Sequence, residues 1–278
     1  MTGSVFTDPA ATAGLYRDSG RLAARTSALH RAKTHGRPVA DVIAKVAACY
    51  VDDPSRSVVA DIGCGRGTSS LVLAERLRPR RLVGLDASAA MLAAARARLA
   101  ALSPAVAAAV EFVQADFHHL PLPDDGCDFA AAAFCLYHAP DPHTVIAEIA
   151  RVLAPGGVAI LVTKSADSYR ELDRLVAAAG LDPGAADRPS LYAAAHGGNL
   201  ADLTAGHLRV LATLEEKHRF AFAGLDHVAA YLATTPKYKL PPGLATDPDA
   251  IATRLRAAWP DEPVTATSTI TYLTATPT

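Results

Sequence analysis

The sequence predicts an α/β protein with a doubly wound, mostly parallel sheet of seven strands. From about Val58 to Lys164, short aliphatic runs alternate with segments of helical periodicity, a pattern typical of parallel strands joined by crossover helices. The 278 residues, half of them hydrophobic, are enough to form one large core. We therefore expect a single domain over residues 1–278.

The first predicted strand, 58–62, leads into a glycine-rich turn. Its aliphatic residues form a continuous run, as expected for a strand buried on both faces. Gly63, Gly65 and Gly67 follow at alternate positions, which lets the backbone turn sharply and approach a ligand closely. A helical pattern begins at Thr68. The turn therefore lies at the carboxyl edge of the sheet, where ligands bind in such folds.

Further strands and helices follow in regular alternation. Strands are recognised as short aliphatic runs, and helices by apolar residues three and four positions apart. Gly156 and Gly157, after Pro155, are typical of the end of a helix. We predict strands at 81–85, 110–114, 129–136 and 158–163, and helices at 68–77, 87–102 and 144–153.

The segments around this block are expected to be mostly helical. We predict helices at 10–35, 39–49 and 169–179, a helical insertion at 225–259, and a sixth strand at 208–222. The alternation of Val264 to Leu273 predicts a final strand at the sheet edge.

Three acidic residues stand at or near the ends of the first three strands. Asp86 lies nineteen residues after the last glycine of the turn, where a carboxylate can accept both hydroxyls of a ribose. Asp61 precedes the glycines, where it would repel a pyrophosphate but attract a cationic ammonium, directly or through water. Asp116 could accept from an adenine amine, with Phe117 stacking nearby. The expected ligand is a nucleoside that carries a positive charge and no phosphate.

Composition argues against several classes of partner. The formal net charge of −1 gives no general attraction to nucleic acids or anionic membranes. No apolar run reaches membrane-spanning length, and Met1 to Pro9 lack the pattern of a secretion signal. A local group of basic residues is predicted to be a solvated helix face: Arg21, Arg25, Arg31, Lys33 and Arg37.

We expect neither a metal site nor disulfides. The cysteines at 49, 64, 127 and 135 have neither paired nor ligand spacing, so free thiols in a reducing cytoplasm explain them and a cytoplasmic location is predicted. His118 and His119 are adjacent, so their rings point in different directions, and no third ligand has suitable spacing.

These motifs resemble the class I S-adenosylmethionine (SAM) dependent methyltransferases, in the branch of small-molecule and quinone methyltransferases. The matching segments are ADIGCGRGTSS at 60–70, VGLDAS at 83–88, VQADFHHLPLPDDGCDFAAAAFCLYHAPDP at 113–142 and EIARVLAPGGVAILV at 148–162. The resemblance implies a Rossmann-like sheet whose last two strands form an antiparallel pair at one edge. It also implies that helical segments cover the active site, here 1–37, 165–207 and 224–262.

The resemblance further implies that this chain binds SAM and releases S-adenosyl-L-homocysteine. The expected cofactor-binding residues are Tyr16, Asp61, Gly63, Cys64, Gly65, Asp86, Ala87, Met91, Ala115, Asp116, Phe117 and Phe134. The expected substrate-binding residues are Tyr137, His196, His227, Tyr231 and Tyr238. For Tyr16 and the other tyrosines the alternative is a role in packing.

The expected reaction is an in-line attack on a methyl group carried by a sulfonium. Because that methyl group is already activated, alignment contributes much of the rate, with effective molarities of about 10⁵ M or more in well-oriented reactions. A general base adds about 10² to 10⁴. His138, just past the fourth strand, is the candidate base, and the alternative is that it shapes the loop or the cofactor pocket.

The leading interpretation is a methyltransferase acting on an O, N or C nucleophile of a small molecule, as a monomer or homodimer. Six lysines against twenty-one arginines, with abundant alanine, suggest a GC-rich bacterial genome and, by association, a secondary-metabolite substrate. Quinone methylation stays open. A SAM-binding protein with a non-methyl-transfer role, such as assisting a cyclisation, is one alternative. A nicotinamide-dependent oxidoreductase is another, which Asp61 disfavours.

Overall fold

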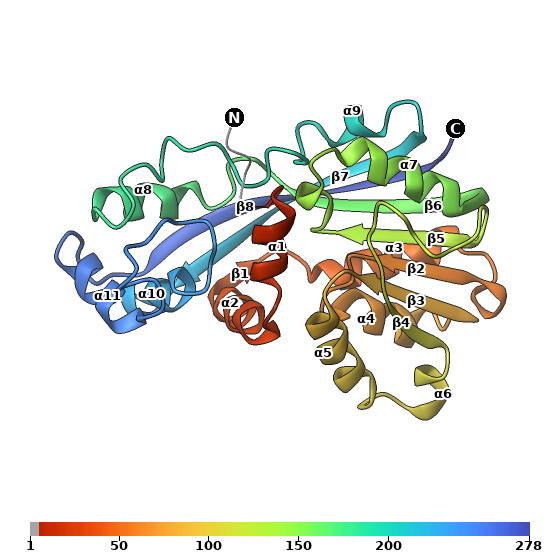
Figure 1. Ribbon diagram of the computed structural model, residues 1–278, viewed down its shortest axis with the longest axis horizontal. Coiled ribbons are helices and arrows are strands. Elements are labelled where there is room, and N and C mark those ends of the chain that lie inside the picture. The colour runs from red at the N-terminus through yellow and green to blue at the C-terminus, as the bar shows by residue number, and fades with distance from the viewer. Residues whose placement is uncertain (1–5) are drawn as a thin grey trace.

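A single mixed sheet of eight strands, in the order β1-β7-β8-β6-β5-β2-β3-β4, forms the centre of the computed structural model, which describes residues 6–278 (Figure 1). Its parallel block consists of β2 (Val58–Ile62), β3 (Arg81–Asp86), β4 (Val110–Gln114), β5 (Cys127–Ala133) and β6 (Leu153–Lys164). The predicted doubly wound α/β fold is confirmed. The fourth strand ends earlier than predicted, at Ala133, and a 3₁₀ turn, η2 (Leu136–His138), follows it.

Strand β2 lies in the middle of the block and is buried on both faces, as its aliphatic run predicts. Successive side chains point to opposite faces. Val59 belongs to the hydrophobic cluster of α3 (Val39–Tyr50) and α4 (Thr68–Arg76), whereas Ala60 and Ile62 belong to that of α7 (Pro142–Val152). Helices therefore cover both faces, and ligand access is left to the edge formed by the strand ends.

The last two strands differ from the prediction in position and length. β7 (Leu208–Phe222) and β8 (Val264–Pro277) form an antiparallel pair, but β8 lies inside the sheet, between β6 and β7. The prediction of a final edge strand at 264–273 is therefore wrong. β8 is largely buried and bonds both neighbours, which its alternating sequence does not reveal.

An eighth strand, β1 (Lys33–His35), pairs antiparallel with β7 at the sheet edge. These three residues lie in the predicted helix 10–35, so the predicted sheet has seven strands and lacks this one. The segment is too short to show a period, and its strand conformation depends on the pairing with β7.

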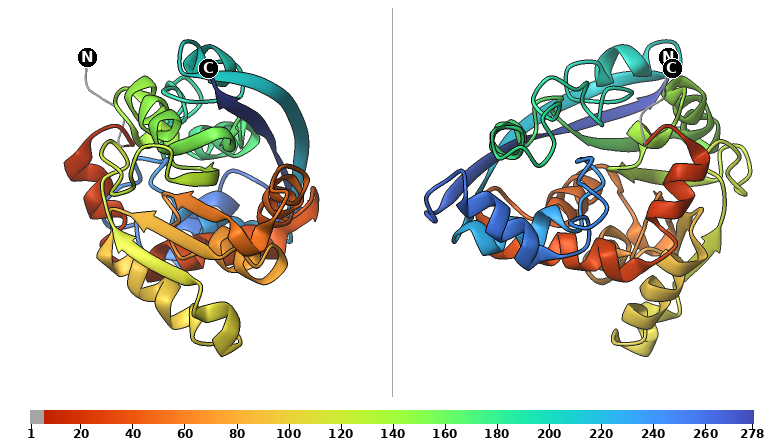
Figure 2. Two further views of the ribbon diagram at one scale, coloured as in Figure 1. Left: turned by 90° about the vertical axis from the view of Figure 1, so that its right-hand side faces the viewer. Right: turned by 60° about the vertical axis from the view of Figure 1, so that its left-hand side comes forward.

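The predicted N-terminal helix is two helices, α1 (Pro9–Leu15) and α2 (Ser19–Ala32). They separate at Tyr16 because Asp18 accepts a hydrogen bond from the amide of Gly20 and so caps α2. Residues 1–5 of the predicted covering segment 1–37 lie outside the described residues. Figures 1 and 2 show α2 between α10 (Leu225–Leu232) and α5 (Ala89–Leu99), both of which it contacts.

The long strands β7 and β8 extend past the parallel block and carry a second hydrophobic cluster (Figure 1). This cluster joins α2 and α10 to α8 (Arg170–Ala178) and α11 (Pro248–Arg256). The remaining short helices are η1 (Pro54–Arg56), α6 (Pro104–Ala107) and α9 (Leu200–Thr204). None of the helices over residues 6–278 has the length and apolar character to cross a membrane.

Candidate functional site

The glycine turn after β2 has one closed and one open side. Gly63 has φ of 64°, and a Cβ there would lie 2.4 Å from the Cβ of Cys135. Gly65 has φ of 55°, but a Cβ there would meet no atom within 4 Å. Gly63 is thus required for packing against the segment after β5, whereas Gly65 faces free space that a ligand can occupy.

Asp86, the last residue of β3, ties this turn to the loop before α5. Its Oδ2 accepts a hydrogen bond from the amide of Gly65 and its Oδ1 accepts one from the amide of Ser88, each at 2.8 Å. Burial raises the pKa of Asp86, while the two hydrogen bonds act in the opposite direction. Since a carboxylate has about four acceptor positions, each oxygen retains capacity for a ligand hydroxyl.

Asp61 lies behind the turn and is only 1% exposed. Its carboxylate accepts a hydrogen bond of 2.5 Å from the hydroxyl of Ser70 on α4. Burial, with the nearby charge of Asp86, raises the pKa of Asp61 to about 7, although the hydrogen bonds from Ser70 oppose the shift. In this geometry Asp61 supports the turn, and its attraction of an ammonium stays a prediction.

Asp116, just after β4, is exposed and is oriented by its neighbour. Its Oδ1 lies 2.9 Å from the amide nitrogen of His118 and 2.7 Å from that residue's Nδ1. The amide of Ala115 donates to the carbonyl of Asp86 at 3.1 Å, which aligns the ends of β4 and β3. Phe117 packs its ring edge-on against that of His118, with ring centroids 4.7 Å apart. Within residues 6–278 no group of potential ligands is arranged to hold a metal.

The other predicted cofactor residues surround the same edge. Cys64 is half-buried beside Gly84, and burial raises the pKa of its thiol. Met91 is buried on α5, and Ala87 is exposed on the loop that precedes it. Phe134, the residue after β5, has φ of 59°, which is strained for a side chain of its size. Such strain costs about 1–3 kcal/mol and is concentrated at functional sites.

Tyr16 and His138 form a hydrogen-bonded pair next to this edge. The Tyr16 hydroxyl lies 2.9 Å from Nε2 of His138, and Nδ1 of His138 lies 3.3 Å from the carbonyl oxygen of Phe6. Because a carbonyl only accepts, Nδ1 carries the proton and Nε2 accepts from the Tyr16 hydroxyl. Burial lowers the pKa of His138 to about 4, so the ring is neutral at pH 7. Ser88 donates its hydroxyl to the Tyr16 carbonyl at 2.8 Å, which fixes the N-terminal segment to the β3–α5 loop.

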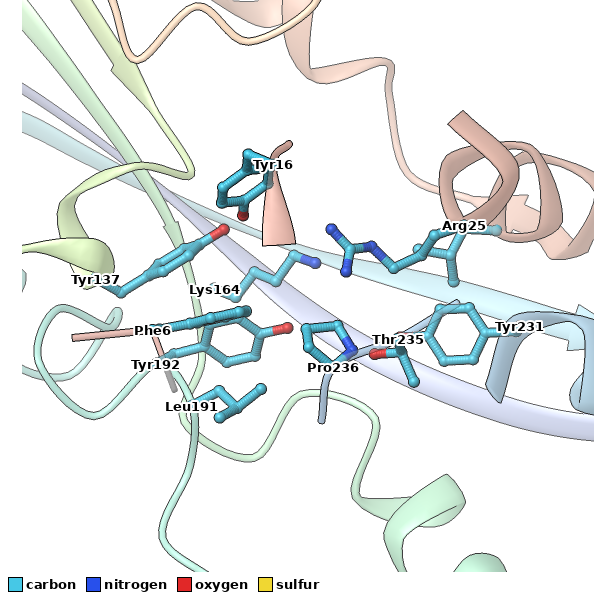
Figure 3. A pocket seen from close by; sticks show the side chains of 11 residues that line it. Phe6, Tyr16, Arg25, Tyr137, Lys164, Leu191, Tyr192, Tyr231, Thr235 and Pro236 are labelled. Atoms are coloured by element: carbon cyan, nitrogen blue, oxygen red, sulfur yellow. The ribbon is translucent and has the colours of Figure 1, made fainter. Parts of the chain in front are cut away.

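A cavity of about 50 Å³ adjoins this pair. In Figure 3 the Arg25 guanidinium and the Lys164 ammonium point toward one central space, together with the hydroxyls of Tyr16 and Tyr137. The residues that line it are Phe6, Tyr16, Arg25, Leu29, Tyr137, Lys164, Leu191, Tyr192, Tyr231, Thr235 and Pro236. For Arg25 the prediction of a solvated helix face is wrong, because α2 packs across the molecule and turns this side chain inward.

The predicted substrate residues separate into two groups. Tyr137 and Tyr231 line the cavity. The Tyr238 hydroxyl donates to Asp173 at 2.9 Å, and His196 accepts at Nδ1 from the amide of Gly198 at 3.1 Å. Both ring nitrogens of His227 are engaged by backbone groups: Nε2 lies 2.9 Å from the carbonyl of Ala28, and Nδ1 accepts from the amide of Ala223. These last three residues do not line the cavity, and their part in substrate binding stays a prediction.

Sequence reasoning did not find Lys164, Arg25 or Tyr192. Lys164 ends β6, so its position at the carboxyl edge of a parallel strand was a usable signal. Arg25 and Tyr192 carry no such signal, because their place depends on how distant segments pack.

Comparison with known proteins finds similarity over the segment that runs from β2 to β6. Residues 60–161 match a family model described as a methyltransferase domain. The trans-aconitate 2-methyltransferase of Methylobacterium radiotolerans is 35% identical over 148 residues, which cover 52% of this chain and 51% of that protein. The malonyl-acyl-carrier-protein O-methyltransferase of a Marinomonas species is 35% identical over 117 residues, 42% of each chain. This chain therefore covers only about half of the length of the curated relatives that it matches.

Structural similarity to solved proteins covers more of the chain than the sequence matches do. The cyclase SpnF superposes with a TM-score of 0.58 and 19% identity, covering 95% of each chain. At this identity the likeness shows a shared fold alone.

Proposed function

We propose that this chain, whose residues 60–161 belong to the class I SAM-dependent methyltransferases, transfers the methyl group of SAM to a nucleophile of a small molecule. The observation that carries the proposal is the arrangement of Asp86 across the glycine turn, with Asp116 at the end of the adjacent strand. The names of the relatives, which include a trans-aconitate methyltransferase, support a small-molecule acceptor. A bacterial secondary metabolite stays the predicted substrate class, and the cytoplasm the predicted location.

The cofactor would be held by the strand ends. Asp86 would accept the two ribose hydroxyls on the acceptor positions that its bonds to Gly65 and Ser88 leave available. Asp116, held in place by His118, would accept from the adenine amine, with Phe117 beside the base. When bound, SAM supplies an activated methyl group on a sulfonium, so the protein's main task is to align the acceptor.

We assign the pair of Tyr16 and His138 a positioning role. An effective general base has a pKa near the working pH. Burial holds the pKa of His138 at about 4, which makes it a weak base at neutral pH. Its Nε2 is also engaged by the Tyr16 hydroxyl, so the pair acts first to fix the N-terminal segment over the methyl-transfer site.

Two measurements test the function. The purified protein, incubated with SAM and a metabolite extract, is expected to form S-adenosyl-L-homocysteine and a product heavier by one methylene. Calorimetry is expected to show binding of S-adenosyl-L-homocysteine and none of NADH. The variant Asp86→Ala should bind S-adenosyl-L-homocysteine more weakly and form less methylated product, whereas Asp52→Ala, which removes an exposed carboxylate away from the site, should leave both unchanged.

A second candidate function is SAM binding without methyl transfer. The fold does not decide between the two roles, because it is shared with the cyclase SpnF and one fold can serve several functions. Tight binding of S-adenosyl-L-homocysteine without any methylated product from broad acceptor extracts would favour this candidate. Preferential binding of NADH would instead favour the nicotinamide-dependent oxidoreductase and exclude both.

A further inference from the structure

We propose that the cavity beside Tyr16 binds a carboxylate group of the acceptor substrate between Arg25 and Lys164. This inference rests on the proposed function and specifies its substrate class. Both cations point into the same space, and none of the eleven described residues that line it is acidic (Figure 3). The cavity is therefore positively charged and is suited to an anion.

Within residues 6–278, no carboxylate pairs with either cation. Among the ion pairs over residues 6–278, none involves Arg25 or Lys164. Lys164 instead donates to the Tyr169 hydroxyl at 3.3 Å, and Arg25 lies beside the Tyr16 hydroxyl. By contrast, the nearby Lys237 is 2.7 Å from the carboxylate of Asp173. Because partly buried charges are costly without a counter-charge, an anionic ligand would complete the arrangement at Arg25 and Lys164.

Aromatic rings hold the lysine in place and form flat walls. The Lys164 ammonium lies 5.4 Å from the ring centroids of Phe134 and Tyr192, and 4.9 Å from that of Tyr169. Such contacts stabilise an ammonium without cancelling its charge. The rings of Tyr137 and Tyr192 pack edge to face, with centroids 5.0 Å apart. These walls suit a planar acid, and a planar guanidinium matches a carboxylate in a bidentate geometry.

The volume fits an acid group rather than a whole substrate. One water requires roughly 10–15 Å³ by the same measure, so a cavity of about 50 Å³ accommodates a group the size of three or four waters. Tyr16 both lines the cavity and bonds His138, and Phe134 contacts Lys164 immediately after β5. A carboxylate held here would therefore direct the rest of the acceptor toward the carboxyl edge where the cofactor is proposed to bind.

The test compares benzoate with its neutral isostere benzamide on the full chain, by calorimetry with and without saturating S-adenosyl-L-homocysteine. We expect benzoate to bind at least tenfold more tightly than benzamide. The variants Lys164→Met and Arg25→Met should each reduce the ratio of benzoate to benzamide affinity at least fivefold. Neither should lower the affinity for S-adenosyl-L-homocysteine. The control Arg31→Met removes an exposed charge from the same helix and should leave the ratio unchanged.

Three results would overturn the inference. One is equal affinity for benzoate and benzamide. Another is a loss of S-adenosyl-L-homocysteine affinity in the two cavity variants, which would assign the cations to the carboxylate of the cofactor. The third is tighter binding of phenyl phosphate than of benzoate, which would assign the cavity to phosphate esters. If the native protein fails to bind S-adenosyl-L-homocysteine at all, the proposed function fails, whereas the preference for benzoate is still measured without that ligand.

Discussion

Replacement of Asp61 by asparagine is expected to stabilise the ligand-free protein at neutral and alkaline pH. Asp61 is almost completely buried, and burial raises its pKa from the usual 3.8 to about 7, against the effect of the Ser70 hydroxyl. Because the raised pKa belongs to the folded state, the protonated carboxyl is favoured there. Its stabilising contribution is complete below pH 4 and is lost as the pH rises to about 7.

The size of the effect follows from the shift. A change of about three units corresponds to roughly 4 kcal/mol at 1.36 kcal/mol per unit. The asparagine carries no charge, and its amide oxygen can keep the hydrogen bond from Ser70. The free energy of unfolding of Asp61→Asn should therefore exceed that of the native protein by up to about 4 kcal/mol at pH 8, and by about 1 kcal/mol at pH 4.5.

Urea unfolding at the two pH values measures this difference, in which the titrating groups distant from Asp61 cancel. Ser70→Ala is the matched control: it removes the donor that opposes the shift, so its stability should fall more steeply with pH than that of the native protein. The reasoning fails if the advantage of Asp61→Asn is the same at pH 4.5 and pH 8. In the same variant the affinity for S-adenosyl-L-homocysteine at pH 8 should fall, since no charge remains to attract its ammonium. Unchanged affinity would contradict that part of the proposal.

Three further predictions concern the same edge. Asp86→Ala should lower the affinity for S-adenosyl-L-homocysteine roughly tenfold to a hundredfold in calorimetry, because charged hydrogen bonds worth about 1–3 kcal/mol are lost. Unchanged affinity would contradict the placement of the ribose. Tyr16→Phe and His138→Phe should each lower kcat by less than about tenfold and leave its pH dependence unchanged. If His138→Phe instead lowers kcat more than about 10²-fold at constant cofactor affinity, His138 acts as a base. Gly63→Ala should cost about 2–4 kcal/mol in thermal or urea unfolding because its Cβ has no room, whereas Gly65→Ala should cost about 1–2 kcal/mol and chiefly weaken cofactor binding. Equal costs at the two glycines would contradict the assigned packing.

The cofactor edge was predictable because its signals are local in sequence. The aliphatic run of β2, the alternate glycines and Asp86 stand close together along the chain, and the parallel pairing of β2 with β3 brings their ends to one edge. The parallel pairing of β3 with β4 likewise brings Asp116 to this edge. Each of these features depends on neighbours within one or two elements.

The cavity was not predictable, because its residues meet only through tertiary packing. Arg25 comes from α2 and Lys164 from the end of β6, and no sequence period relates them. The two wrong predictions about the sheet have the same physical cause. The three residues of β1 adopt a strand only against β7, and β8 lies inside the sheet because β7 adds to its outer edge.

The proposed cofactor site and the proposed acceptor cavity differ in how closely they are tied to the hydrophobic core. The residues proposed to hold the cofactor project from strands whose side chains also form the central hydrophobic clusters, so substitutions there disturb both binding and stability. The proposed acceptor cavity is lined by side chains from the N-terminal segment, η2, the end of β6, the 191–192 loop, α10 and the residues that follow α10. Arg25 lies on α2 and Lys164 at the end of β6, so replacing either one leaves the hydrophobic side chains around β2 in place. Charge selectivity of the acceptor site is therefore expected to vary independently of cofactor binding, which is what the Arg25 and Lys164 variants measure.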